Sequence, residues 1–189
     1  MEKICIFCGS NNGHNALYRK AVIDLIAEIK KEGMGIIYGG GKVGLMGLVA
    51  SESIKSSVSI TGVMPNFLVE REIAHDDIDE LIKVKDMGER IKTMADLSNG
   101  FLILPGGFGT FEELFEILSW SQMGLHTKPI GVLNIAGFFN PLISLINNSI
   151  DSGFAPKENK ELIIIDSSIE SLLSKMKDFK HELPNKYMN

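Results

Sequence analysis

One short stretch, Leu104 to Leu114, combines an anion-binding type of loop with two carboxylates. Its sequence, LPGGFGTFEEL, places three glycines after an apolar run and a threonine shortly before Glu112 and Glu113. Glycine-rich turns that open helices present backbone N–H groups to anions such as phosphate. A carboxylate beside such a loop can take a proton from water or stabilise a developing positive charge. The stretch therefore suggests a ligand with an anionic end and a reacting centre.

The same residues also have a structural explanation, which the sequence leaves open. Thr110 and Glu113 have the spacing of a capping box, in which the threonine caps a helix and the glutamate bonds back to the cap. Glu112 is favourable near the positive end of a helix dipole. Upstream, the segment DMGERIK carries Arg90, which could hold a phosphate or a carboxylate, or could simply be solvated.

Alternating strands and helices must position these residues. Continuous apolar runs, which are typical of strands buried on both faces, predict strands at 4–8, 35–38, 59–64, 81–84, 101–104, 130–133 and 162–165. Helices are predicted at 15–32, 45–56, 87–98, 110–123 and 138–151. This order predicts an α/β fold: a three-layer, doubly wound, Rossmann-like, mostly parallel sheet of about seven strands, with helices on both faces and one domain over residues 1–189.

Small or polar residues follow several of the predicted strands. Folds of this kind bind ligands beyond the carboxyl ends of their strands, where glycines allow close approach to the backbone. The strand ends concerned are Gly9-Ser10, Gly39-Gly40-Gly41, Gly62 and Pro105-Gly106-Gly107. Their recurrence favours a binding crevice, with Ser10 and Gly41 among the candidate contacts.

The segment YGGGKVGLMG contains the dinucleotide-binding pattern G-x-G-x-x-G, but its context does not fit. The next predicted strand ends in TGVMP, without the acidic residue that would hold a ribose. A Walker A loop is also excluded, because Val43 follows Lys42 where a serine or threonine is required. We therefore expect no nicotinamide cofactor, while a backbone anion site remains possible.

Composition and spacing argue against several other classes. The 189-residue chain has a net charge of -5 and lacks a long basic run, so nucleic acid is not an expected partner. Neither a signal peptide nor a membrane-spanning stretch is visible, so we expect a cytoplasmic location without membrane contact. Cys5 and Cys8 should point to opposite faces of their strand and be buried. Because the histidines also lack ligand spacing, no metal is expected.

The segment PGGFGTFEE resembles the P-G-G-x-G-T-x-x-E motif of the Lonely Guy family, cytokinin riboside 5'-monophosphate phosphoribohydrolases that are often mislabelled lysine decarboxylases. The resemblance spans nearly the whole chain, through CGS, YGGGKVGLMG, GVMP, REIAH, MGERIK, WSQMGLHTKPIGVLN and GFFNPLISLI. It implies hydrolysis of the N-glycosidic bond of adenine-type nucleoside 5'-monophosphates, a cytokinin precursor or AMP, to free base and ribose 5-phosphate. It also implies a homodimer that needs no cofactor.

The resemblance assigns catalysis to Arg90 and Glu113. It implies that substrate is contacted by Glu72, Arg90, Ile91, Gly107, Phe108, Gly109, Thr110, Phe111, Glu112, Glu113 and Ser119. The family usually reads M-H-x-R-K where this chain has Gly88 and Ile91. This departure bears on substrate preference or rate more than on the reaction. The alternative function is a non-catalytic nucleotide or cofactor carrier on the same fold.

Overall fold

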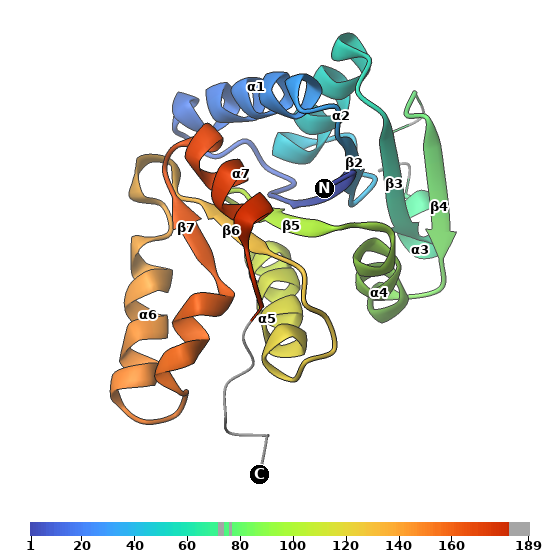
Figure 1. Ribbon diagram of the computed structural model, residues 1–189. Coiled ribbons are helices and arrows are strands. Elements are labelled where there is room, and N and C mark those ends of the chain that lie inside the picture. Colours follow the sequence, from blue (N-terminus) through green and yellow to red (C-terminus); the bar gives the residue numbers. More distant parts are fainter. Residues whose placement is uncertain (72–73, 76, 182–189) are drawn as a thin grey trace.

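A seven-stranded parallel sheet forms the middle layer of the protein (Figure 1). The computed structural model describes residues 1–71, 74–75 and 77–181. The sheet has the order β4-β3-β2-β1-β5-β6-β7, and every pairing between neighbouring strands is parallel. The strands are β1 (Lys3–Phe7), β2 (Gly35–Tyr38), β3 (Ile60–Pro65), β4 (Glu80–Val84), β5 (Gly100–Ile103), β6 (Ile130–Leu133) and β7 (Ile164–Asp166).

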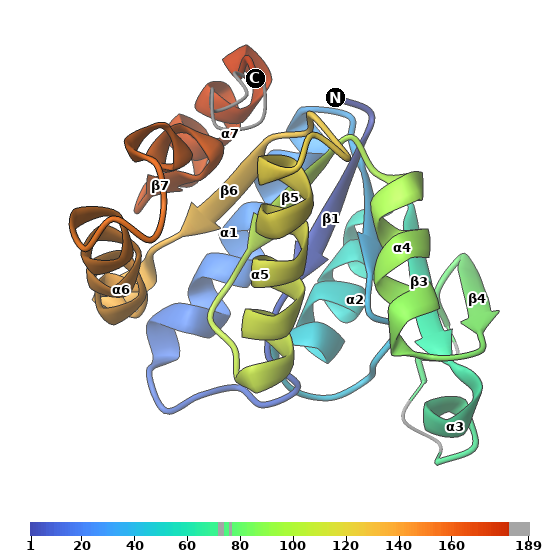
Figure 2. The same cartoon turned by 90° about the horizontal axis from the view of Figure 1, so that it is seen from below.

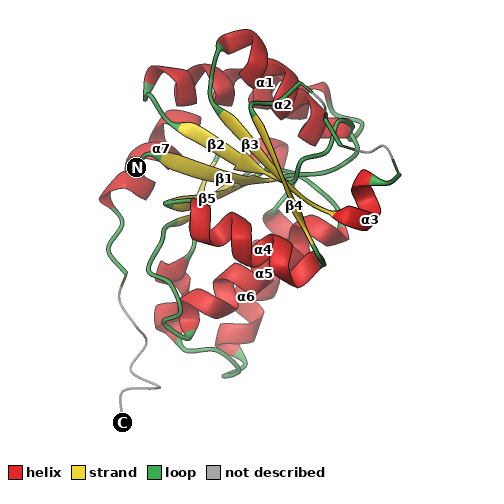
Figure 3. Ribbon diagram, turned by 90° about the vertical axis from the view of Figure 1, so that its right-hand side faces the viewer, coloured by secondary structure: helices red, strands yellow, loops and turns green. Residues whose placement is uncertain are grey.

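Helices cover both faces of the sheet, as predicted. Viewed along the sheet, α1, α2 and α7 lie on one face and α4, α5 and α6 on the other (Figure 3). The α-helices are α1 (Ala16–Lys31), α2 (Gly44–Ser56), α3 (Asn66–Val69), α4 (Met87–Leu97), α5 (Phe108–Gln122), α6 (Asn140–Asp151) and α7 (Ile169–Asp178). Two 3₁₀ turns, η1 (Ile135–Gly137) and η2 (Lys157–Leu162), flank α6. The three-layer α/β prediction is confirmed.

The hydrophobic core has two parts because the central strands bury both of their faces. Along β1, Ile4 and Ile6 pack into the cluster beneath α1, α2 and α7. Cys5 and Phe7 point the other way, into the cluster beneath α4, α5 and α6. Cys8 lies in the same cluster as Ile4 and Ile6. The two cysteines are therefore buried on opposite faces of the sheet, as their odd spacing predicted.

The centre of the sheet contains a topological switch point. From β1 the chain first adds β2, β3 and β4 on one side and then returns to place β5 on the other side of β1. The loops that follow β1 and β5 therefore leave neighbouring strands on opposite faces, and a crevice is expected between them. A hydrogen bond from the Gly9 N–H to the Pro105 carbonyl, 3.1 Å long, joins the two loops.

Figure 2 shows α4 and α5 together on one face of the sheet. These two helices carry Arg90 and Glu113.

Several elements differ from the sequence prediction, among them the short helix α3, which was not predicted. The strand predicted at 162–165 begins later, at Ile164, because the preceding residues form η2. Helix α7 was not predicted, although Ser168 caps it by accepting a hydrogen bond from the Ser171 N–H. Within the described ranges, no helix is both long enough and apolar enough to cross a bilayer.

Candidate active site

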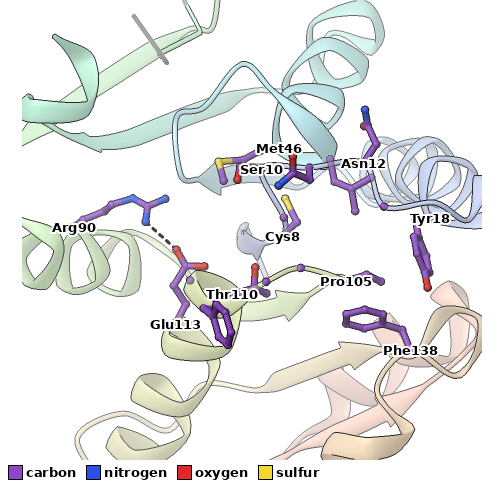
Figure 4. Close-up of a pocket in the computed structure, with 18 residues that line it drawn as sticks. Cys8, Ser10, Asn12, Tyr18, Met46, Arg90, Pro105, Thr110, Glu113 and Phe138 are labelled. Carbon is purple, nitrogen blue, oxygen red and sulfur yellow. Dashed lines mark hydrogen bonds and ion pairs between the residues drawn. The ribbon is translucent and has the colours of Figure 1, made fainter. Parts of the chain in front are cut away.

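A cavity of about 510 Å³ opens at the carboxyl ends of β1 and β5. Its walls come from the β1–α1 loop, the first turn of α2, the β5–α5 loop and the start of α5. Arg90 of α4 and Phe138, which follows η1, complete the lining (Figure 4). The cavity lies at the switch point, where a fold of this type is expected to bind its ligand.

The first turn of α4 carries Arg90 and is held by side-chain caps at its N-terminus. Asp86 is the N-cap and accepts a hydrogen bond from the Glu89 N–H at 2.9 Å. The Glu89 carboxylate in turn accepts one from the Lys85 N–H at 2.6 Å. These bonds satisfy N–H groups at the helix start and fix the turn that bears Arg90.

Arg90 is 6% exposed, and its guanidinium donates hydrogen bonds to three partners. Its Nε donates to the carbonyl of Val63 at 3.1 Å, and its Nη2 donates to that of Gly39 at 3.3 Å. Its Nη1 donates to Oε1 of Glu113 at 2.9 Å. Strands β2 and β3 therefore anchor the guanidinium, and one of its edges faces a single carboxylate.

Glu113 lies on the second turn of α5 and is 5% exposed. The capping box, which the sequence left open as an alternative role for Glu113, is not formed, because α5 begins at Phe108 and its N-cap is Gly107. Thr110 is therefore already inside the helix, where it is buried and lines the cavity. Glu113 bonds to Arg90 rather than to the start of its own helix.

Burial raises the pKa of the Glu113 carboxyl from its ordinary value of 4.5 to about 7. The charge and hydrogen bond of Arg90 oppose this rise, and the nearby charge of Glu112 adds to it. A carboxyl group with a pKa near neutrality is present in both protonation states at physiological pH, which suits an acid–base catalyst.

The N-terminus of α5 lies beside this pair and has the chemistry to hold an anion. Among the described residues no side chain caps it, and the residues that carry its first N–H groups, Phe108 to Thr110, line the cavity. A Cβ added at Gly107 or Gly109 would meet no described atom within 4 Å. Packing does not require glycine at these two positions, and the space above them is open to a ligand. Gly106 differs, because a Cβ there would overlap the Thr110 side chain.

The structure brings many of the predicted site residues together and places others elsewhere. Those that line the cavity are Ser10, Arg90, Gly107, Phe108, Gly109, Thr110 and Glu113. Gly41 is buried and forms a bridge with Ala74, and Glu112 is exposed on α5. Glu72 lies outside the described residues.

Three further predicted contacts are not among the residues that line the cavity. Ile91 is 1% exposed within the core beneath α4, because one residue turns a helical side chain by about 100° from Arg90. Phe111 is half-buried and stacks against Phe138. Ser119 lines a second cavity of about 270 Å³ between α5, α6 and η2.

Sequence reasoning did not identify several lining residues, among them Tyr18, Met46 and Phe138. Tyr18 is in the first turn of α1 and Met46 in the first turn of α2, both helices that follow glycine-containing strand ends. Their place in the first turn of a helix that follows such a strand end was the signal that could have identified Tyr18 and Met46 as lining residues. Across the described part of the chain, no group of three or more histidine, cysteine or acidic side chains is arranged to hold a metal ion.

Together, the fold and site define a Rossmann-like α/β protein with a glycine-capped helix start and a buried arginine–carboxylate pair beside it. The family model described as "Possible lysine decarboxylase" matches residues 46–176. The chain is 40% identical over 177 residues to the probable cytokinin riboside 5'-monophosphate phosphoribohydrolase LOGL1 of Oryza sativa subsp. japonica, covering 94% of this chain and 79% of that protein. It is 38% identical to the corresponding LOG1 enzyme of Arabidopsis thaliana, covering 96% and 86%. The chain belongs to this Lonely Guy family, which confirms the resemblance.

Solved structures share the fold at lower identity. A molybdenum cofactor binding protein from Rippkaea orientalis superposes with a TM-score of 0.69 at 20% identity, covering 94% of this chain and 96% of that one. DNA processing protein A from Helicobacter pylori superposes with a TM-score of 0.59 at 17% identity, covering 94% and 81%. At these identities the similarity concerns the fold alone.

Proposed function

We propose that this protein hydrolyses the N-glycosidic bond of adenine-type nucleoside 5'-monophosphates, such as a cytokinin riboside 5'-monophosphate or AMP. The products are the free base and ribose 5-phosphate. The observation that carries the proposal is the buried Arg90–Glu113 pair, 2.9 Å apart, beside the open N-terminus of α5. The names of the relatives point to the same reaction.

The 5'-phosphate binds at the start of α5, where the N–H groups from Gly107 to Thr110 and the helix dipole favour an anion. The binding energy of the phosphate positions the ribose, which carries no charge of its own through which the protein could hold it. From there the ribose reaches Glu113, which is less than one helical turn beyond Thr110.

Glu113 acts on the attacking water. Loss of the base gives the ribose an oxocarbenium-like character, which a neighbouring carboxylate stabilises. The water oxygen bonds to C1' as the bond from C1' to the base nitrogen breaks, and Glu113 accepts the proton that the water loses. The bonding electrons leave with the base, which takes up a proton. Arg90 holds the carboxylate in place and keeps part of it ionised.

The assay incubates the protein with AMP and with isopentenyladenosine monophosphate and follows the free base by chromatography. We expect release of the base, and a loss of at least about a hundredfold in kcat for Glu113→Gln. Glu116→Gln is the matched control, because it neutralises another carboxylate of α5 that does not line the cavity. Absence of cleavage, or a Glu113→Gln enzyme as active as the control, contradicts the proposal. AMP binding without turnover would instead indicate a carrier.

The assembly we propose is a homodimer. Large apolar side chains are exposed on α5, on α6 and shortly after α6, with Phe115 at 42%, Leu145 at 54% and Phe154 at 84%. A cluster of exposed apolar side chains often marks an interaction surface. Light scattering during size exclusion measures the mass directly, and a monomer at micromolar concentration contradicts this assembly.

A further inference from the structure

The cavity has a second end, which the proposed hydrolysis does not use. In Figure 4, Arg90 and Glu113 lie on one side of the cavity and Tyr18 and Phe138 on the opposite side, with Thr110 between them. All of these residues line the same cavity.

The topology sets the separation of the two ends. Arg90 donates to Gly39, directly after β2, whereas Phe138 follows β6. In the sheet, β1 and β5 lie between these strands, so their ends are three strand spacings apart, about 14 Å. With the phosphate at the start of α5, near Thr110, a ribose that extends from it to Glu113 leads away from the distant rings (Figure 4). A group on the other side of the phosphate is the part of the ligand that meets them.

The distant end is an aromatic cluster. The ring of Phe138 meets that of Tyr18 edge to face, with centroids 5.8 Å apart and an angle of 79°. It also stacks against Phe111 at 6.5 Å and 16° and meets Phe139 at 4.9 Å and 90°. Tyr18 and Phe138 are half-buried. The neighbouring rings fix their positions, and the exposed part of each side chain lines the cavity.

The backbone before Phe138 is held in a sharp turn. Asn134 Oδ1 accepts a hydrogen bond from the Phe139 N–H at 2.8 Å, and Asn134 Nδ2 donates to Asn140 Oδ1 at 2.8 Å. Between them, Ala136 and Gly137 are left-handed, with φ values of 51° and 72°. A left-handed alanine is unfavourable on its own, so the surrounding contacts must maintain this turn. Phe138 is thereby positioned before any ligand arrives.

We infer that the aromatic end binds a second ring group, joined to the ligand through its phosphate, so that the cavity accommodates a dinucleoside pyrophosphate. This inference rests on the proposed placement of the phosphate at Gly107–Thr110. One nucleoside then lies at Glu113 and the pyrophosphate at the start of α5. The polar wall from Ser10 to Gly13 runs beside the second nucleoside, and the second base stacks on Phe138.

Calorimetric binding to the Glu113→Gln protein, which blocks turnover, tests the inference. The ligands are AMP, ADP and diadenosine pyrophosphate, and ADP controls for the second phosphate alone. We expect diadenosine pyrophosphate to bind about tenfold more tightly than ADP, as stacking of one base on an aromatic ring supplies. Phe138→Leu keeps an apolar side chain but removes the ring, and should abolish this preference with little effect on AMP. Phe179→Leu, at a half-buried phenylalanine that follows α7 and lies outside the cavity lining, is the matched control.

Two results would overturn the inference: diadenosine pyrophosphate binding no more tightly than ADP, or Phe138→Leu weakening all three ligands equally. Tyr18→Leu removes the neighbouring ring from a different helix and tests the same preference if Phe138→Leu does not fold. The measurement does not depend on hydrolysis. Failure to cleave AMP would therefore count against the proposed function and leave the binding comparison intact.

Discussion

Gly39 and Arg90 are packed so closely that a Cβ at position 39 would overlap Nη2 of the arginine. The same nitrogen donates to the Gly39 carbonyl at 3.3 Å. The glycine at the end of β2 thus makes room for the guanidinium and also helps to orient it. A glycine that initially suggests a nucleotide-binding fingerprint here accommodates a side chain of the protein itself.

We predict that Gly39→Ala lowers kcat at least tenfold, because the added methyl group displaces the guanidinium from Glu113. A misplacement of about 1 Å can cost this much or more. Gly88→Ala is the control on the same helix as Arg90, since, apart from the backbone of its own helix, the described atom that its Cβ would meet is Asp86 Oδ1, at an ordinary contact distance of 3.5 Å. Steady-state kinetics compare the two variants. Equal kcat values would show that Gly39 does not determine the position of Arg90.

The rate should depend on the protonation of Glu113. With a pKa of about 7, kcat should rise with pH through neutrality as the carboxylate forms. Glu112 adds to the rise of this pKa, so Glu112→Gln should move the acidic limb of the profile to lower pH. Asp96→Asn neutralises an exposed carboxylate at the far end of α4 and should leave the limb unchanged. A limb that moves equally in both variants contradicts this assignment.

The same pKa predicts a change of stability with pH. Because Glu113 holds its proton more tightly in the folded state than in the unfolded chain, its stabilising contribution is complete below about pH 4.5. It is lost as pH rises through 7. The Gln side chain of Glu113→Gln cannot ionise, so the variant does not lose this contribution. The free energy of unfolding of the variant relative to that of the wild type should therefore increase by on the order of 1–3 kcal/mol from pH 5 to pH 8. Urea unfolding at both values measures the difference, and parallel pH dependences would argue against a raised pKa.

The family's usual lysine does not fit position 91 of this chain without cost. Ile91 is 1% exposed in the core, so Ile91→Lys should lower the free energy of unfolding by at least about 2 kcal/mol. Ile23→Lys, at a position of α1 that is 46% exposed, should be nearly neutral. Thermal and urea unfolding of both variants check this. A stable Ile91→Lys protein would mean that the side chain can leave the core and reach the cavity.

The architecture could be predicted from the sequence because the strands are recognisable as short, continuous apolar runs. Runs such as ICIF and FLIL are buried on both faces of the sheet, and this pattern is typical of strands in a parallel sheet covered on both faces. The order of the strands was not visible, since pairing depends on contacts between distant parts of the chain. Helix α7 was missed for another reason. Its apolar residues Leu172, Leu173 and Met176 stand among lysines and serines, and only packing against the sheet shows their role.

The charged part of the site was also visible in sequence, because the motif that contains Glu113 and the segment that contains Arg90 are both distinctive. The start of α5 was not. A threonine three residues before a glutamate has the same spacing inside a helix as at its cap, and the glycine cap had no side chain to signal it. The aromatic end was hidden for a topological reason. Tyr18 and Phe138 are 120 positions apart and meet only because β1 and β6 flank β5.

Helix α5 holds both ends of the proposed reaction on one rigid segment. Its first turn faces the phosphate, and Glu113 follows Thr110 by three residues, a rise of about 4.5 Å along the axis. An α-helix does not stretch, so the distance between anion and carboxylate is built into the protein and does not depend on loop closure. The helix therefore sets the distance from phosphate to C1' that a substrate must have. A nucleoside 3'-monophosphate has the same charge and the same base as the 5'-monophosphate, but its phosphate lies at a different distance from C1' and does not match the helix.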